Sequence, residues 1–139
     1  MRLICFGDSW TAGHGVEVDE KYKESSTPPL FIEKLREQNS WPRFTAEKLG
    51  CQFINNGVCG YGNKYIYEEL YTCLRNGFIY EDDIIIVMFS YPYRYVKHDT
   101  ETFIDIYNLI EKELFGIKHF YFNSFYPSFK DFDFDITKL

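Results

Sequence analysis

The chain has 139 residues, a length typical of one domain, and 45% of them are hydrophobic, which is enough to build a core. Its formal net charge is −6 and no basic stripe is present, so the sequence argues against nucleic acid as a partner. Aromatic residues make up 20% of the chain. This high aromatic content indicates either a substrate groove lined with aromatic rings or an AT-biased genome. Ile, Asn and Lys are also frequent, which favours the genome bias.

The four cysteines, at positions 5, 51, 59 and 73, form neither a CxxC pair nor a cluster with histidine, which argues against structural zinc. No cofactor motif is present either. The first apolar run, residues 3–6, is too short for a signal peptide, and no run reaches membrane-spanning length. We therefore expect a cytoplasmic protein with reduced thiols, no metal or cofactor and no membrane partner.

The apolar, β-prone run at residues 3–6 ends abruptly at Gly7-Asp8-Ser9, which predicts a buried strand followed by a tight turn. A serine at the carboxyl end of a parallel strand lies where open α/β sheets carry their chemistry. The alternative is an ordinary turn in which Asp8 and Ser9 satisfy backbone groups. His14 opens a polar segment and is either a solvated loop histidine or a base for Ser9.

The middle of the chain predicts alternating helices and a strand. Helical spacing of apolar residues predicts helices over 30–38 and 41–49. In the second helix, Phe44 and Leu49 are expected to face a sheet, with Ala46 near them. Residues 51–55 predict a short strand.

A glycine-rich loop and another helix follow this strand. Three glycines in the six residues 57–62 mark a loop whose backbone closely approaches another group. A helix from 63 to 76 comes next, with Asn63 as its predicted cap.

Residues 83–89 give the clearest strand, because a continuous apolar run bounded by acids is typical of a central parallel strand. The turn after it begins at Pro92, which cannot continue a ladder. Arg94 is then expected at the carboxyl end of the sheet, with Ser9 and Gly60.

A last helix and strand complete the pattern. They are predicted over 100–115 and 117–123, and His119 inside the strand is expected to be a core or sheet-face histidine. This β–α–β–α–β–α–β order gives a parallel sheet with helices on both faces.

Two segments of this pattern resemble the SGNH, or GDSL-type, hydrolases. Residues 7–13, GDSWTAG, are similar to the first block of the family, with Ser9 in the nucleophile position. Residues 55–60, NNGVCG, are similar to the second block, with Gly60 matching the glycine whose amide helps to form the oxyanion hole. The resemblance implies one SGNH hydrolase-like domain over residues 1–139, with a three-layer α/β/α, flavodoxin-like fold and a mostly parallel sheet.

Two other blocks of the family depart from this sequence. Where the family has an asparagine donor in a GxND context, the chain reads SYPYR over 90–94, a form similar to that of some divergent, often phage-borne members. Ser90 or Arg94 would then replace the donor. The DxxH block that supplies the catalytic histidine after a fifth strand is not found, and the nearest string, 135–138, ends in lysine. We therefore expect a C-terminally truncated domain with four strands and no fifth.

The resemblance implies a serine ester hydrolase, such as a deacetylase, a lipase-like enzyme or a thioesterase, acting on a small-molecule or carbohydrate ester. Ser9 would attack the acyl carbon, the amides of Ser9 and Gly60 would hold the oxyanion, and Asp8, Asn63, Ser90 and Arg94 would support the site or contact the substrate. Activity should be weak without the DxxH histidine. The alternative is a non-catalytic SGNH-like scaffold that binds a carbohydrate or a partner protein through its Tyr-rich segment, 91–95.

The strand 117–123, IKHFYFN, is expected to be an exposed edge with Lys118 as its only obvious charge. We expect two chains to pair through it as a two-fold dimer. Size-exclusion chromatography with light scattering at micromolar concentration should then give the mass of a dimer. A clean monomer with a cooperative melt would mean that the Phe-rich segment 124–139 covers the strand instead.

Overall fold

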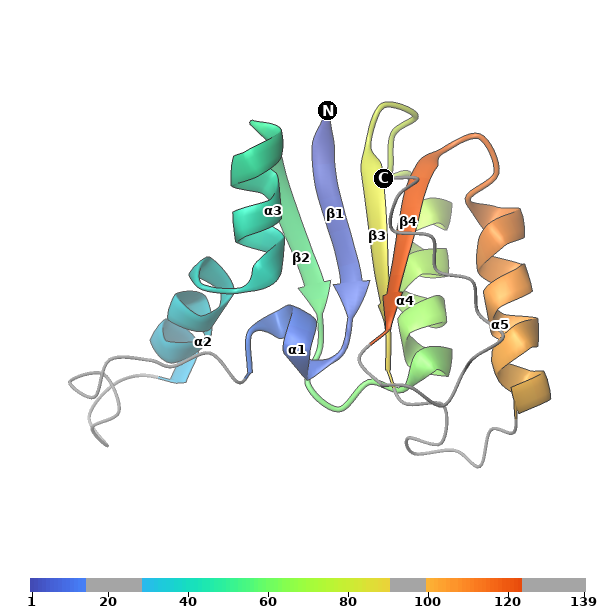
Figure 1. Cartoon of the computed structure of the whole chain (residues 1–139), viewed down its shortest axis with the longest axis horizontal. Helices are drawn as coiled ribbons and strands as arrows, with labels where there is room; N and C mark the ends of the chain where they lie inside the picture. Colours follow the sequence, from blue (N-terminus) through green and yellow to red (C-terminus); the bar gives the residue numbers. More distant parts are fainter. Residues whose placement is uncertain (15–28, 91–99, 124–139) are drawn as a thin grey trace.

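The computed structural model describes residues 1–14, 29–90 and 100–123 and contains one four-stranded parallel sheet (Figure 1). Its strands lie in the order β2-β1-β3-β4, and each strand pairs in parallel with its neighbours. This confirms the predicted α/β class with a parallel sheet. The strands are β1 (Arg2–Gly7), β2 (Gln52–Gly57), β3 (Ile84–Phe89) and β4 (Lys118–Asn123).

Five helices connect these strands, and none of those in the described residues is long and apolar enough to cross a membrane. Helix α3 covers one face of the sheet, and α4 and α5 cover the other (Figure 1). The helices are α1 (Ser9–Ala12), α2 (Pro29–Gln38), α3 (Trp41–Leu49), α4 (Asn63–Arg75) and α5 (Thr100–Glu113).

Strand β2 is longer than the sequence predicts. It continues through Asn55 and Asn56 to Gly57, although asparagine and glycine disfavour strands. The reason is tertiary, because these residues pair with the end of β1 and the Val58 amide donates to the Gly7 carbonyl at 3.1 Å.

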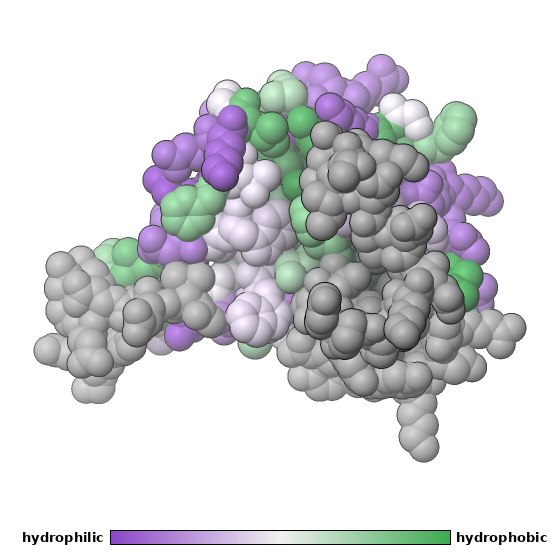
Figure 2. All heavy atoms as spheres, in the orientation of Figure 1, coloured by the Kyte–Doolittle hydropathy of each residue, from purple (hydrophilic) through white to green (hydrophobic). Residues whose placement is uncertain are grey.

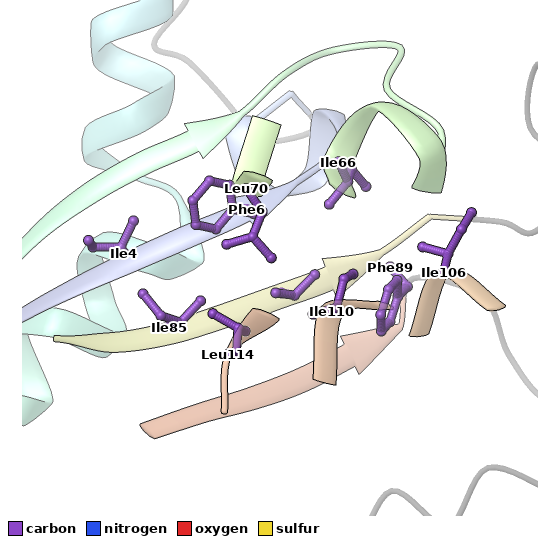
Figure 3. Packing of buried hydrophobic residues seen from close by; sticks show 10 residues of the cluster. Ile4, Phe6, Ile66, Leu70, Ile85, Phe89, Ile106, Ile110 and Leu114 are labelled. Atoms are coloured by element: carbon purple, nitrogen blue, oxygen red, sulfur yellow. The ribbon is translucent and has the colours of Figure 1, made fainter. Parts of the chain in front are cut away.

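The larger core lies between the sheet and helices α4 and α5. Because strand side chains alternate, Ile4 and Phe6 of β1 face this core while Leu3 and Cys5 face α3. Figure 3 shows the side chains of the two helices meeting those of the strands. Each fully buried side chain of this size contributes about 1.5–3 kcal/mol. The cluster consists of Ile4, Phe6, Ile66, Leu70, Ile85, Val87, Phe89, Ile106, Ile110 and Leu114.

Helix α3 approaches the opposite face through small residues, and the prediction that Phe44 and Leu49 face the sheet is wrong. Pro42 and Ala46 are buried there, whereas Phe44 and Leu49 are 46% and 45% exposed. Figure 2 shows hydrophobic residues among hydrophilic ones over this helix. A small residue such as Ala46 allows close packing on β1 and β2, and apolar spacing alone does not reveal which stripe is used.

A buried ion pair joins the starts of β1 and β3 at the amino edge of the sheet. Asp83 is 1% exposed and binds the Arg2 guanidinium through both carboxylate oxygens, at 3.0 and 2.6 Å. Its Oδ2 also accepts from the Tyr80 amide at 2.8 Å. Burial raises the pKa of Asp83, but the bonds from Arg2 and Tyr80 outweigh it and hold that pKa below its usual value.

We expect Asp83→Asn to lower the free energy of unfolding by about 2 kcal/mol at pH 7, because it leaves the partly buried Arg2 guanidinium without its carboxylate. A carboxyl group whose pKa is lower in the folded chain than in the unfolded chain stabilises the fold at pH values above its unfolded-state pKa. This stabilisation is lost as the pH falls through its folded-state pKa. Urea denaturation should therefore show the difference shrinking toward pH 3. Asp82→Asn, at an exposed neighbour paired with the chain's amino group, is the control, and equal losses in both variants would contradict the assignment.

Candidate functional site

Helix α1 begins at Ser9, directly after β1, because the residues around it fix both of its ends. Asp8 is the buried N-cap, and its Oδ1 accepts a hydrogen bond from the Trp10 amide at 3.0 Å. Gly13 ends the helix with a φ of 90°, a conformation that glycine adopts without strain. Figure 1 shows α1 beside the arrowheads of β1 and β2, at the carboxyl edge of the sheet.

Two paired glycines allow α1 to lie directly against the strand ends. Gly7 of β1 is the register partner of Gly57 of β2. A Cβ on Gly57 would collide with the Ala12 backbone nitrogen, and one on Gly7 would collide with the Thr11 side chain. Only residues without a side chain fit at these two positions, so this pair fixes the place of α1 and of Ser9.

The turn that carries Gly60 leaves β2 at the same level. The Tyr61 amide closes it by donating to the Val58 carbonyl at 3.2 Å, and Gly60 has a φ of 88°. Ser9 lies two residues beyond Gly7, and Gly60 lies three residues beyond the register partner of Gly7. The structure thus brings the segments of the two sequence blocks to neighbouring strand ends.

The backbone amides of Ser9 and Gly60 both remain available as donors. Neither amide donates a hydrogen bond to any residue in the described part of the chain, and the same is true of the Ser9 hydroxyl. The first backbone amides of a helix have no acceptor within that helix, which explains why the Ser9 amide makes no such bond. The Gly60 amide lies in a turn that offers it no acceptor among the described residues. An oxyanion requires two donors of this kind aimed at one point.

Asn55 ties three elements together beneath α1, a role that the sequence analysis missed. Its Nδ2 donates to the Thr11 carbonyl at 2.7 Å and to Ser40 Oγ at 3.3 Å, while its Oδ1 accepts from the Gly57 amide at 2.9 Å. The signal available was an asparagine inside a strand, where this residue type is disfavoured.

Asn63 connects α4 to the end of β3. Its Oδ1 accepts from the Ser90 amide at 2.7 Å, and its Nδ2 donates to the Ser90 carbonyl at 3.0 Å, with both residues buried. The predicted capping role is wrong, because Gly62 is the N-cap and Asn63 is the first helical residue. Its side chain instead hydrogen-bonds to the backbone of Ser90, the residue that follows β3. Arg94 lies outside the described residues.

The histidines differ in their distance from this edge. His119 lies at the level of Ile85 in β4, where its Nε2 is 3.0 Å from a Glu111 carboxylate oxygen and its Nδ1 is 2.6 Å from the Ile117 carbonyl. Burial raises the pKa of Glu111, but hydrogen bonds from Tyr121 and His119 outweigh it and lower that pKa. His119 is thus a sheet-face histidine, as predicted, and His98 lies outside the described residues.

His14 lines a cleft of about 390 Å³ between α1, α2 and the turn after β2, here called the α1–α2 cleft. Its backbone amide donates to the Ser9 carbonyl at 2.8 Å, so it lies one turn beyond the serine. No group of three or more His, Cys, Asp or Glu residues that could hold a metal ion occurs in the described segments.

Comparison with known proteins supports the fold and no more. No protein-family model and no curated protein matches the chain. Among solved structures, one described as "a putative lipolytic protein of G-D-S-L family from Desulfitobacterium hafniense DCB-2" is similar, with a TM-score of 0.61 and 14% sequence identity. The match covers 86% of this chain and 57% of that one. The chain therefore shares the fold of that protein and spans little more than half of its length.

We expect Asn63→Ala to lower the free energy of unfolding by about 2 kcal/mol, because the buried Ser90 amide and carbonyl would each lose a partner. Asn39→Ala is the matched control, since the Asn39 amide group makes one exposed bond, to the Leu35 carbonyl. Thermal and urea denaturation measure both. Similar small losses in the two variants would show that Asn63 does not hold the end of β3.

Proposed function

We propose that the chain is an SGNH-like serine ester hydrolase with Ser9 as its nucleophile. The observation that carries the proposal is the pairing of Gly7 with Gly57 at adjacent strand ends. It supports the proposal because Ser9 and Gly60 follow these glycines by two and three residues, and neither backbone amide bonds to a described residue. The similar fold of a GDSL-family structure agrees with it.

In this mechanism Ser9 Oγ forms a bond to the acyl carbon, and the carbonyl oxygen becomes an oxyanion held by the amides of Ser9 and Gly60. Collapse of this intermediate breaks the ester bond and releases the alcohol, which takes up a proton. Water then hydrolyses the acyl-serine and restores the hydroxyl. Asp8 keeps the first turn of α1 in place, while Asn63 and Ser90 fix the third strand end.

The fate of the Ser9 proton sets the rate. No histidine in the described segments bonds to the Ser9 hydroxyl, and in the proposed mechanism its proton passes to water. Removal of a triad base costs on the order of 10⁴–10⁶ in kcat. A slow esterase is therefore the expected behaviour, with Arg94 as a proposed contact to an anionic group of the substrate.

The second candidate function is a non-catalytic scaffold that binds a carbohydrate or a partner protein. The Ser9 hydroxyl bonds to no base within the described segments, which favours this function because a serine without a base is a poor nucleophile. The two functions differ in whether Ser9 reacts covalently.

We expect a fluorophosphonate probe to label the wild-type chain and Ser40→Ala but not Ser9→Ala. Ser40 is the control because its buried hydroxyl donates to the Glu37 carbonyl at 2.6 Å. The hydrolysis of p-nitrophenyl acetate should lie barely above background and should fall to background in Ser9→Ala. Labelling that survives in Ser9→Ala would rule out this nucleophile, and no labelling of any chain would favour the scaffold.

A further inference from the structure

Strand β2 forms one edge of the sheet, and its outer side has no strand partner among the described residues. The Val58 amide donates to the Gly7 carbonyl, and backbone direction alternates along a strand. Phe53, Asn55 and Gly57 therefore direct their N–H and C=O groups outward, away from β1. The Gly57 amide is already bonded to Asn55 Oδ1 at 2.9 Å. The backbone amides of Phe53 and Asn55 donate to no described residue, so this edge is open to a further strand.

An apolar pocket lies beside this edge, on the side of the sheet that faces α4. Ile4 is 2% exposed, whereas its register partner Ile54 is 38% exposed, so the fold covers β1 on this side but leaves β2 partly open. The pocket, here called the β2 pocket, has a volume of about 190 Å³. Its apolar lining consists of Ile4, Ile54, Cys73, Phe78, Ile79 and Tyr80.

The size of the β2 pocket favours a single side chain over a whole small molecule, whose sites usually measure about 300–1,000 Å³. Phe78 and Tyr80 in its wall are 62% and 56% exposed. Side chains of an added strand alternate between the two faces of the sheet, so those on the α4 side would lie next to Ile54 and above the pocket. An extended chain bound along β2 would therefore cover these exposed apolar groups.

Two carboxylates near the β2 pocket determine the charge that such a chain should carry. Glu81 is exposed and directly follows the pocket wall. Burial raises the pKa of the Cys73 thiol, and the nearby Glu69 carboxylate adds to this rise. Neither glutamate forms an ion pair with a described residue, and the Arg2 guanidinium is bound by Asp83. Basic side chains complement this surface, whereas a second copy of this chain, with a net charge of −6, does not.

We propose that the outer side of β2 binds an extended peptide segment of a partner protein, which adds to the sheet as a strand and places an apolar side chain in the β2 pocket. Basic side chains that flank this apolar residue pair with Glu69 and Glu81. Backbone bonds to Phe53 and Asn55 supply affinity, and the pocket and the two carboxylates supply selectivity. The inference does not rest on the proposed hydrolase, since no group of that mechanism takes part.

The experiment adds a synthetic peptide to the full chain and follows the solvent exchange of backbone amides by ¹⁵N NMR. The peptide KTITLTK, blocked at both ends, carries its basic and apolar side chains on one face. At millimolar concentration it should slow the exchange of the Phe53 and Asn55 amides at least about tenfold. The amides of Ile54 and Asn56, which face β1, should change little. A peptide that docks only through side chains would not give this alternation.

Matched peptides and variants test the pocket and the charges separately. The charge-reversed peptide ETITLTE should give much weaker protection. Phe78→Ser should weaken the binding of KTITLTK at least about fivefold, whereas Phe115→Ser, at a 90% exposed ring outside the pocket, should not. Glu69→Gln/Glu81→Gln should remove the preference for KTITLTK, and Glu33→Gln on α2 should retain it.

Four results would overturn the proposal. Equal protection by the two peptides would contradict the role of charge, and binding without protection of Phe53 and Asn55 would contradict strand addition. No effect of either peptide would show that the edge does not accept a peptide of this kind. Protection that grows with the concentration of the chain alone would assign the edge to a second copy instead.

Discussion

The arrangement of the carboxyl edge depends on two positions where no side chain fits. Gly7 and Gly57 end adjacent strands as register partners, and a Cβ on either would collide with α1. Their absence of side chains lets a four-residue helix, α1, lie directly against the sheet, with Asp8 and Gly13 fixing its ends. The place of Ser9 beside the segment that carries Gly60 follows from this close approach.

Different kinds of interaction hold the two ends of the strands. The apolar core and the Arg2–Asp83 pair hold the middle and the amino edge. The carboxyl edge is instead held by side-chain amides, with Asn55 beneath α1 and Asn63 at the end of β3. Such bonds position backbone groups without covering them, which is what a site that works through backbone amides needs.

The sequence predicted the parallel sheet and the helix layers on its two faces, because they depend on local apolar runs and on right-handed crossovers. It failed where the outcome depends on partners distant in the chain. The buried side of α3 is set by Ala46 rather than by Phe44, since close packing there favours a small residue. Asn63 fits a capping pattern, yet its amide binds Ser90, 27 residues away. Local propensity could not reveal this bond.

The central claim is that the amides of Ser9 and Gly60 form one oxyanion site. The most direct test is a crystal structure of the chain after phosphonylation, in which the phosphonyl oxygen stands for the oxyanion. The account predicts that this oxygen lies about 3 Å from both amide nitrogens. An adduct on Ser9 whose phosphonyl oxygen points to solvent, away from the Gly60 amide, would contradict it.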